Sequence, residues 1–116
     1  MSDFGTSDPF VGTMKGVIMN IHLDAKIVDL SHEISPFNII MHGAIMLQTS
    51  YKHFPPETIF VTIVDPTVGS DRKGILMEAD GFYFIGPDNG ILWPILKTAT
   101  SKKITHIQNS RYFQVL

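Results

Sequence analysis

The chain has 116 residues, of which 44% are hydrophobic and 17% charged; this balance suits one globular domain and excludes a disordered chain. A formal net charge of −2 gives no electrostatic footprint for nucleic acid, and the lack of cysteine excludes disulfides and thiolate metal sites. No apolar run approaches a membrane span and no signal peptide is visible, so we expect a cytoplasmic protein that binds neither membrane nor nucleic acid.

The first half of the chain predicts two helices and two strands. Asp8 followed by Pro9 is typical of a helix start with the carboxylate as N-cap, and apolar residues then recur at helical spacing as far as Ile21. A short strand is predicted at 26–30, a second helix from Ser35 to the Pro-Pro pair at 55–56, and a strand at 58–64. We expect Val61, Ile63 and Val64 to lie centrally in the sheet, with Met14, Val17 and Ile18 packed on it.

The second half of the chain predicts a hairpin, a short helix and a last strand. Two strands, 75–79 and 82–85, flank Asp80-Gly81, which is a hairpin signal. Asn89-Gly90 indicates a turn, a helix follows at 91–98 with Pro94 near its start, and 103–107 reads as a weak strand. The alternation of helices and strands predicts an α/β fold with a mainly parallel sheet flanked by helices.

The strand at 58–64 ends in a carboxylate, Asp65, and a guanidinium, Arg72, returns seven residues later. Between them, Pro66 and Gly69 indicate a turn. In open α/β sheets ligands bind at the carboxyl ends of strands, so this pair is suited to holding a polar reactant. Residue chemistry alone leaves the other interpretation open, in which Asp65 begins an ordinary turn and Arg72 is a solvated surface residue.

Three further motifs accompany this loop. The chain opens Ser-Asp-Phe-Gly-Thr-Ser-Asp-Pro from Ser2, Ile-Val-Asp-Leu-Ser-His-Glu-Ile spans 27–34, and Gly-Pro-Asp-Asn-Gly spans 86–90. In this order the four motifs resemble the S-adenosylmethionine hydroxide adenosyltransferases, also called adenosine-forming S-adenosylmethionine hydrolases, a family related to the fluorinases and chlorinases. The resemblance covers nearly the whole chain, with departures at Thr67, where the family usually has Gly, and Lys73, where a second Arg is common.

The resemblance implies which residues are catalytic and which hold the ribose. Asp65 and Arg72 match the family's catalytic Asp and Arg, including their spacing. The family completes this set with a His in a segment that would follow Leu116. Asp3 matches the carboxylate that accepts hydrogen bonds from the ribose hydroxyls; residue chemistry alone favours the alternative of a loop Asp that serves a turn.

Three more substrate-binding positions are implied. Asp8 matches a position near the methionine part of the substrate in the halogenating relatives, although helix capping is the favoured interpretation and the two roles can coexist. Phe37 matches an aromatic that could flank a sugar or base, and core packing is the alternative. Asn89 belongs to a motif that we interpret as mainly structural. Its side chain can also donate a hydrogen bond to a residue that itself contacts the reacting groups. His32 is interpreted as a hydrogen-bonded structural residue.

The implied reaction is displacement at the ribose C5′ of S-adenosylmethionine by water or hydroxide, which yields adenosine and methionine without a metal or cofactor. The family assembles as trimers, with each site between one chain's N-terminal domain and a neighbour's C-terminal β-rich domain. Residues 1–116 are then expected to be a single α/β domain, incomplete at both ends. The alternatives are a module that binds an adenosine compound without turnover, a halogenating enzyme, against which the presence of both Asp65 and Arg72 argues, and a non-functional fragment.

Overall fold

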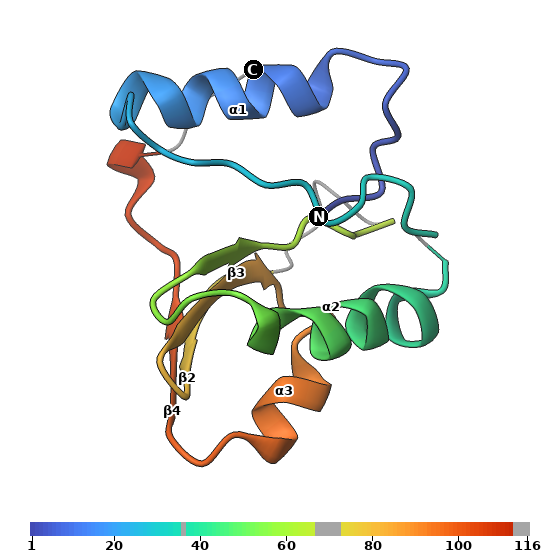
Figure 1. Cartoon of the computed structure of the whole chain (residues 1–116), viewed down its shortest axis with the longest axis vertical. Helices are drawn as coiled ribbons and strands as arrows, with labels where there is room; N and C mark the ends of the chain where they lie inside the picture. The colour runs from blue at the N-terminus through green and yellow to red at the C-terminus, as the bar shows by residue number, and fades with distance from the viewer. Residues whose placement is uncertain (36, 67–72, 113–116) are drawn as a thin grey trace.

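The computed structural model describes residues 1–35, 37–66 and 73–112 (Figure 1). Its strands form one main sheet; Figure 1 shows α1 at the top, the strands in the lower left, and α2 and α3 to the right of them. The elements are α1 (Phe10–Ile21), a π-helical turn (Ile39–Ala44), α2 (Ile45–Ser50), a 3-10 turn (Tyr51–His53), β1 (Ile59–Val61), β2 (Gly74–Ala79), β3 (Phe82–Pro87), α3 (Trp93–Thr98), β4 (Lys102–His106) and a 3-10 turn (Ser110–Tyr112).

The four strands form one mixed sheet in the order β1-β3-β2-β4. The β1–β3 pair is parallel, whereas β2 is antiparallel to both β3 and β4. The predicted α/β class is confirmed, but the main sheet is mixed rather than mainly parallel. The reason is local: the predicted hairpin exists, and its two-residue turn forces β2 and β3 to run in opposite directions. Asp80 and Gly81 both have positive φ, 48° and 87°, as such turns require.

Residues 1–3 lengthen the parallel part of this arrangement beyond β1. The Met1 nitrogen donates to the Val61 carbonyl at 2.8 Å, and Ser2 forms a parallel bridge with Ile63. On the other side, the Ser2 N–H donates to the Ser31 carbonyl at 3.0 Å. The predicted strand at 26–30 is wrong, because this pairing begins only at Ser31 and the preceding segment buries neither Ile27 nor Val28, which is 67% exposed.

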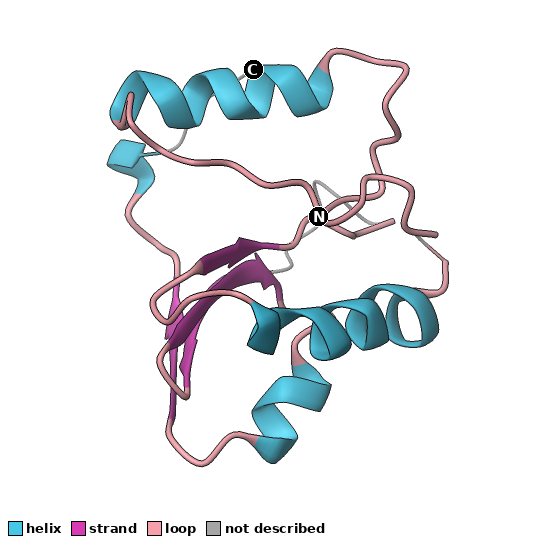
Figure 2. Cartoon of the chain, in the orientation of Figure 1, coloured by secondary structure: helices cyan, strands magenta, loops and turns pink. Residues whose placement is uncertain are grey.

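The helical segment before β1 supplies one side of the core. Its π, α and 3-10 parts follow one another from Ile39 to His53, and Figure 2 shows them as one run of helix. Ala44 and Leu47 are fully buried, while Ile45 is 41% exposed. Tyr51 lies in the 3-10 part of this run. Its ring contacts three phenylalanine rings of the strands edge-on, with centroid distances between 5.3 and 6.4 Å: Phe60, Phe82 and Phe84.

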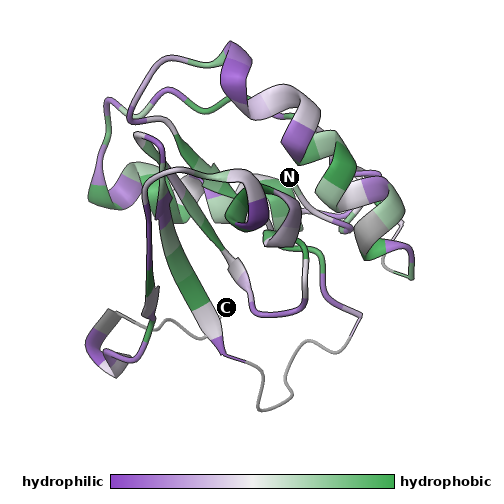
Figure 3. Cartoon of the chain, turned by 90° about the horizontal axis from the view of Figure 1, so that it is seen from below, coloured by the Kyte–Doolittle hydropathy of each residue, from purple (hydrophilic) through white to green (hydrophobic). Residues whose placement is uncertain are grey.

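The first helix begins later than the sequence indicates. Pro9 is the N-cap residue, because its carbonyl accepts the first helical bond from the Thr13 N–H at 2.8 Å, and no side chain caps the helix. The predicted N-cap role of Asp8 is therefore wrong: its exposed carboxylate lies one residue too early. No residue of α1 is fully buried, and in the view of Figure 3 hydrophobic colour runs along much of the strands. Met14, one of three residues expected to pack on the sheet, is half-buried.

In the sheet itself, Val64 is fully buried, and Val61 and Ile63 are half-buried. Since β1 is the edge strand of the four, the expected central position of this segment comes from residues 1–3, which cover its free side at Ile63. Within the described ranges, no helix has the length and apolar character needed to cross a membrane.

Close approach of two backbones fixes the strand that leads to Asp65. The Thr62 N–H and its hydroxyl both donate to the Ile85 carbonyl, at 2.8 and 3.1 Å. A Cβ added to Gly86 would lie 2.7 Å from the Thr62 carbonyl oxygen and closer still to its Oγ1. Glycine is therefore required at this position to let β3 lie against the strand end.

We predict that Gly86→Ala destabilises the protein by about 1–3 kcal/mol, because the added methyl group must push the two strands apart. The matched control is Gly12→Ala in α1, where an added Cβ meets nothing within 4 Å. That change should leave stability unchanged or raise it by about 0.5–1 kcal/mol, since glycine is unfavourable inside a helix. Denaturant unfolding of both variants measures the difference, and equal stabilities would contradict the close-approach argument.

The hairpin turn also anchors the segment that leads into β4. The Asp80 carboxylate accepts the N–H groups of Ser101, at 2.8 Å, and Thr100, at 3.1 Å. These bonds, that from Ser101 first, lower the pKa of Asp80 from its ordinary value of 3.8. The carboxylate therefore stabilises the fold above that value, and this contribution is lost as the pH falls through the lowered pKa.

We predict that Asp80→Asn reduces the free energy of unfolding at pH 7 and that the difference from the unmodified protein shrinks as the pH falls below about 4. Asparagine suits this test because it tolerates the positive φ of residue 80 and removes the charge while keeping one oxygen that can accept the Ser101 N–H. Denaturant unfolding at several pH values measures the difference. A difference independent of pH would show that the charge does not contribute.

Candidate active site

Two of the predicted carboxylates lie at the same edge of the paired segments. Ser2 and Ile63 are bridge partners in parallel segments, so Asp3 follows one segment and Asp65 the other at their carboxyl ends. The Asp3 N–H donates to the Ile63 carbonyl at 3.3 Å, which ties the two ends together. Carboxyl ends of parallel strands are where α/β folds bind ligands.

Asp65 is buried, with 8% of its surface exposed, and follows the fully buried Val64. Burial of a carboxylate is costly unless neighbouring groups compensate it, so such a residue is more typical of a functional position than of a solvated turn. Asp3 is half-buried. Arg72, the predicted partner of Asp65, lies outside the described residues.

The motif at 86–90 forms hydrogen bonds to the backbone on both sides of the segment 65–72. The Asn89 amide Nδ2 donates to the Val64 carbonyl at 2.7 Å, and its Oδ1 accepts the Ile91 N–H at 3.2 Å. One residue earlier, the Asp88 N–H donates to the Lys73 carbonyl at 2.9 Å. Asn89 thus acts on the backbone directly before Asp65, and it is Gly90, with φ of 92°, that supplies the left-handed turn.

The other two predicted binding residues lie on exposed loops. Phe37 precedes the π-helical turn and is 88% exposed, which excludes the core-packing alternative. Asp8 is exposed and lies on the loop that leads into α1. The structure brings together Asp3, Asp65 and Asn89 through their backbone neighbours. Within the part of the chain that it describes, no hydrogen bond, ion pair or ring contact joins Phe37 or Asp8 to these three.

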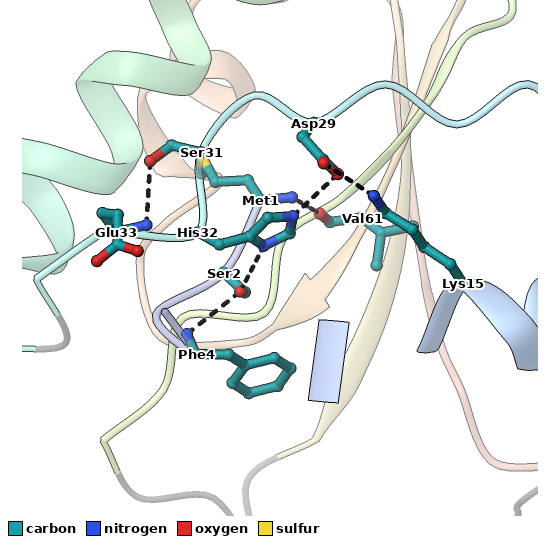
Figure 4. A network of polar contacts seen from close by, with 9 residues as sticks. All are labelled: Met1, Ser2, Phe4, Lys15, Asp29, Ser31, His32, Glu33 and Val61. Atoms are coloured by element: carbon teal, nitrogen blue, oxygen red, sulfur yellow. Dashed lines mark hydrogen bonds and ion pairs between the residues drawn. The ribbon is translucent and has the colours of Figure 1, made fainter. Parts of the chain in front are cut away.

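A polar network next to Asp3 was not predicted from the sequence (Figure 4). The ring of buried His32 contacts the Ser2 hydroxyl through Nδ1 at 2.7 Å and the Asp29 carboxylate through Nε2 at 3.0 Å. The other Asp29 oxygen accepts the Lys15 ammonium at 2.8 Å. The hydrogen-bonded structural role expected for His32 fits this geometry. Its partners Ser2 and Asp29, and the Lys15 that pairs with Asp29, carry no sequence signal beyond the three-residue spacing of Asp29 and His32.

Charge in this network is arranged so that Asp29 stays ionised. Its pKa is lowered, mainly by the hydrogen bond from Lys15 and then by that from His32. Because the carboxylate is largely exposed to solvent, the ion pair itself contributes little to stability. The effect of this ion pair is to keep an ionised hydrogen-bond acceptor, Asp29, next to the Nε2 atom of His32. Among the described residues, no three His, Asp or Glu side chains are grouped so that they could hold a metal ion.

Comparisons with known proteins agree with this fold and these motifs. An (R)-S-adenosyl-L-methionine hydrolase from Methanocaldococcus jannaschii is 48% identical over 116 residues, a match that spans 96% of this chain and 43% of the relative. A fluorinase from Actinopolyspora mzabensis is 28% identical, with 84% of this chain and 40% of the relative covered. The crystal structure of an uncharacterized conserved protein from Thermotoga maritima superposes with a TM-score of 0.90 at 36% identity, covering 97% of this chain and 43% of the other.

The chain therefore spans less than half of the length of these relatives. The family model described as the SAM hydroxide adenosyltransferase N-terminal domain matches residues 1–115, which is nearly the whole of this chain. This match, together with the four motifs and the shared fold, shows that the chain belongs to the SAM hydroxide adenosyltransferase N-terminal domain family.

Proposed function

We propose that this chain forms the ribose-binding and nucleophile-activating part of an S-adenosyl-L-methionine hydrolase that produces adenosine and L-methionine. The observation that carries the proposal is the parallel bridge between Ser2 and Ile63, because it brings Asp3 and Asp65 to one edge. The name of the Methanocaldococcus jannaschii relative, 48% identical to this chain, supports the substrate.

In the proposed reaction a water oxygen forms a bond to the ribose C5′ while the bond from C5′ to sulfur breaks. The electron pair of that bond returns to sulfur, so methionine leaves as a neutral thioether and needs no general acid. The difficulty lies with the nucleophile. Asp65, buried at the strand end, accepts a hydrogen bond and then the proton from the attacking water, and holding the reactants in line contributes about 7 kcal/mol or more in well-oriented systems.

Arg72 is assigned from the sequence alone, as the residue that orients Asp65 and favours the anionic nucleophile. Asp3 accepts hydrogen bonds from the two ribose hydroxyls. Asn89 keeps the backbone before Asp65 in place through its bond to the Val64 carbonyl. Phe37, as an exposed aromatic, flanks the sugar or base, and Asp8 lies toward the methionine part.

The proposal extends to the assembly and the location. The family resemblance supports a homotrimer in which residues 1–116 are one α/β domain and a second domain from a neighbouring chain completes each site with the remaining catalytic His. An exposed aromatic such as Phe37 fits a site that is closed by another domain. The composition of the chain supports a cytoplasmic location.

A halogenating activity is the second candidate, because relatives named fluorinase match 84% of this chain. In such an enzyme a halide ion replaces water as the nucleophile at C5′. A buried carboxylate at the strand end opposes this candidate, since Asp65 would repel an incoming halide.

We predict that the full-length natural protein containing residues 1–116 converts S-adenosyl-L-methionine to equal amounts of adenosine and methionine. The assay is run with and without fluoride or chloride and read by chromatography. Formation of a halogenated adenosine that depends on the halide would replace the hydrolase proposal with the halogenating one. Binding without any product would instead leave only an adenosine-binding module.

We predict that Asp65→Asn lowers kcat by about 10²–10⁴-fold, the range typical of a lost general base, with a much smaller change in substrate affinity. The control is Asp24→Asn, which removes an exposed carboxylate from the turn after α1 and should leave both constants unchanged. The readout is steady-state kinetics together with substrate binding by calorimetry. Weakened binding with unchanged turnover would contradict the assigned role of Asp65.

A further inference from the structure

Asp3 lies at the centre of a tight turn that the preceding serine closes. The Phe4 N–H donates to the Ser2 hydroxyl oxygen at 3.2 Å, so the ring of atoms between them encloses the backbone of Asp3. The next residue, Gly5, has φ of 70° and donates its N–H to the His32 carbonyl at 2.7 Å. Since the backbone on both sides of Asp3 is fixed in this way, the direction of its Cα–Cβ bond is fixed too, which limits where its carboxylate can lie.

The Ser2 hydroxyl is itself aimed by His32 (Figure 4). Ser2 is fully buried, so no bulk water competes for its oxygen. A hydroxyl has one proton, and because its oxygen accepts the Phe4 N–H, the proton is free to point at Nδ1 of His32, 2.7 Å away. We therefore assign Nδ1 as the acceptor nitrogen of the ring and Nε2 as the donor to Asp29.

The charged end of the network keeps this tautomer in place. The ionised Asp29 presents an oxygen to Nε2 at 3.0 Å and is held by Lys15 from α1. A carboxylate on Nε2 favours the ring proton at that nitrogen and leaves Nδ1 free to accept. The series of hydrogen bonds thus begins at the Phe4 N–H in the turn around Asp3, runs through Ser2 and His32, and ends at the Asp29 carboxylate.

The same three residue types form the nucleophilic triads of hydrolases, but this network is built for another purpose. A nucleophilic serine must reach its substrate, whereas the Ser2 side chain has no exposed surface and its hydroxyl oxygen is already occupied by the Phe4 N–H. The buried hydroxyl instead connects the ring of His32 to the backbone beside a candidate binding residue.

We propose that His32 is a positioning residue for substrate binding: through the Ser2 hydroxyl it sets the direction of the Asp3 carboxylate and thereby the recognition of the ribose hydroxyls. The inference rests on the proposed function, in which Asp3 binds those hydroxyls. His32 acts through Ser2 and does not touch the substrate.

Two substitutions test the Nδ1 contact and the Nε2 contact of His32 separately. His32→Asn places an amide oxygen near the position of Nδ1, where it can accept the Ser2 hydroxyl proton. His32→Gln places its amide near the position of Nε2, where it can donate to Asp29 but leaves the Ser2 hydroxyl without its acceptor. The same pair of changes at His22, which is exposed at the end of α1, serves as the control.

The test compares S-adenosylmethionine with its 2′-deoxyribose analogue in the full-length natural protein that contains residues 1–116. We expect His32→Gln to raise KM for the natural substrate by about tenfold, roughly the loss of one well-made hydrogen bond, and to reduce the preference over the deoxy analogue by a similar factor. The value of kcat should change by less than about twofold, as expected when uniform binding is lost. His32→Asn and both His22 variants should stay close to the unmodified protein.

A direct measurement of the network keeps the test independent of turnover. The ¹⁵N shifts of the His32 ring should report a proton on Nε2, and exchange of the Phe4 amide should be faster in His32→Gln than in His32→Asn. Equal amide exchange in the two variants, or a ring proton on Nδ1, would overturn the proposal.

The kinetic outcomes distinguish failure of this inference from failure of the proposed function. If Asp3→Ala abolishes the preference for the ribose while His32→Gln leaves it intact, Asp3 binds the ribose and the positioning role of His32 is wrong. If Asp3→Ala itself leaves the preference unchanged, Asp3 does not bind the hydroxyls, and both the assignment and the inference that rests on it are overturned.

Discussion

The hydrogen bonding of residues 1–3 on both sides is the constraint on which most of the candidate site depends. On one side these residues pair with 61–63, and on the other with Ser31 and Ile34. A parallel ladder fixes which residue lies opposite which, and a slip by one residue would turn each side chain to the opposite face. The position of Asp3 relative to Asp65, the burial of Ser2 and its contact with His32 all follow from this one register.

This pairing also explains how a helix without a buried residue is attached to the domain. The contacts of α1 with the rest of the chain include the ion pair between Lys15 and Asp29 and the ring contact of Phe10 with Phe4, whose centroids are 6.0 Å apart. Both partners belong to the segments that flank residues 1–3. The helix therefore meets the rest of the chain beside the turn that holds Asp3, through Asp29 and Phe4.

Elements with a strong local signal could be predicted from the sequence, whereas those that depend on tertiary partners could not. The β2–β3 hairpin follows from Asp80-Gly81, and the short helix with Pro94 near its start is also present. The strand at 26–30 failed because apolar residues alone do not form a strand without a neighbour to pair with. Capping by Asp8 failed because a carboxylate before proline fits two positions, and only the backbone geometry shows that Pro9 is the cap.

The residues of the candidate site also divide into those with a local sequence signal and those that depend on tertiary partners. That Asp3 and Asp65 end neighbouring segments could be inferred, because carboxylates after strands collect at one edge of an α/β sheet. The contact between Ser2 and His32 joins residues 30 positions apart and has no local pattern to announce it. The role of Asn89 was predicted only in general terms, since the sequence does not reveal that its amide reaches the carbonyl of Val64.

The two backbone anchors supplied by Asp88 and Asn89 have a consequence for how this protein can evolve. They fix the chain at Val64 and at Lys73, so the distance that the intervening segment must span is set by the scaffold. Closing a longer loop between fixed ends is entropically cheap, at about 0.6 kcal/mol for each doubling of its length. The fold itself therefore tolerates insertions between these anchors, and drift in the length of this segment among descendants would be limited by chemistry and not by folding.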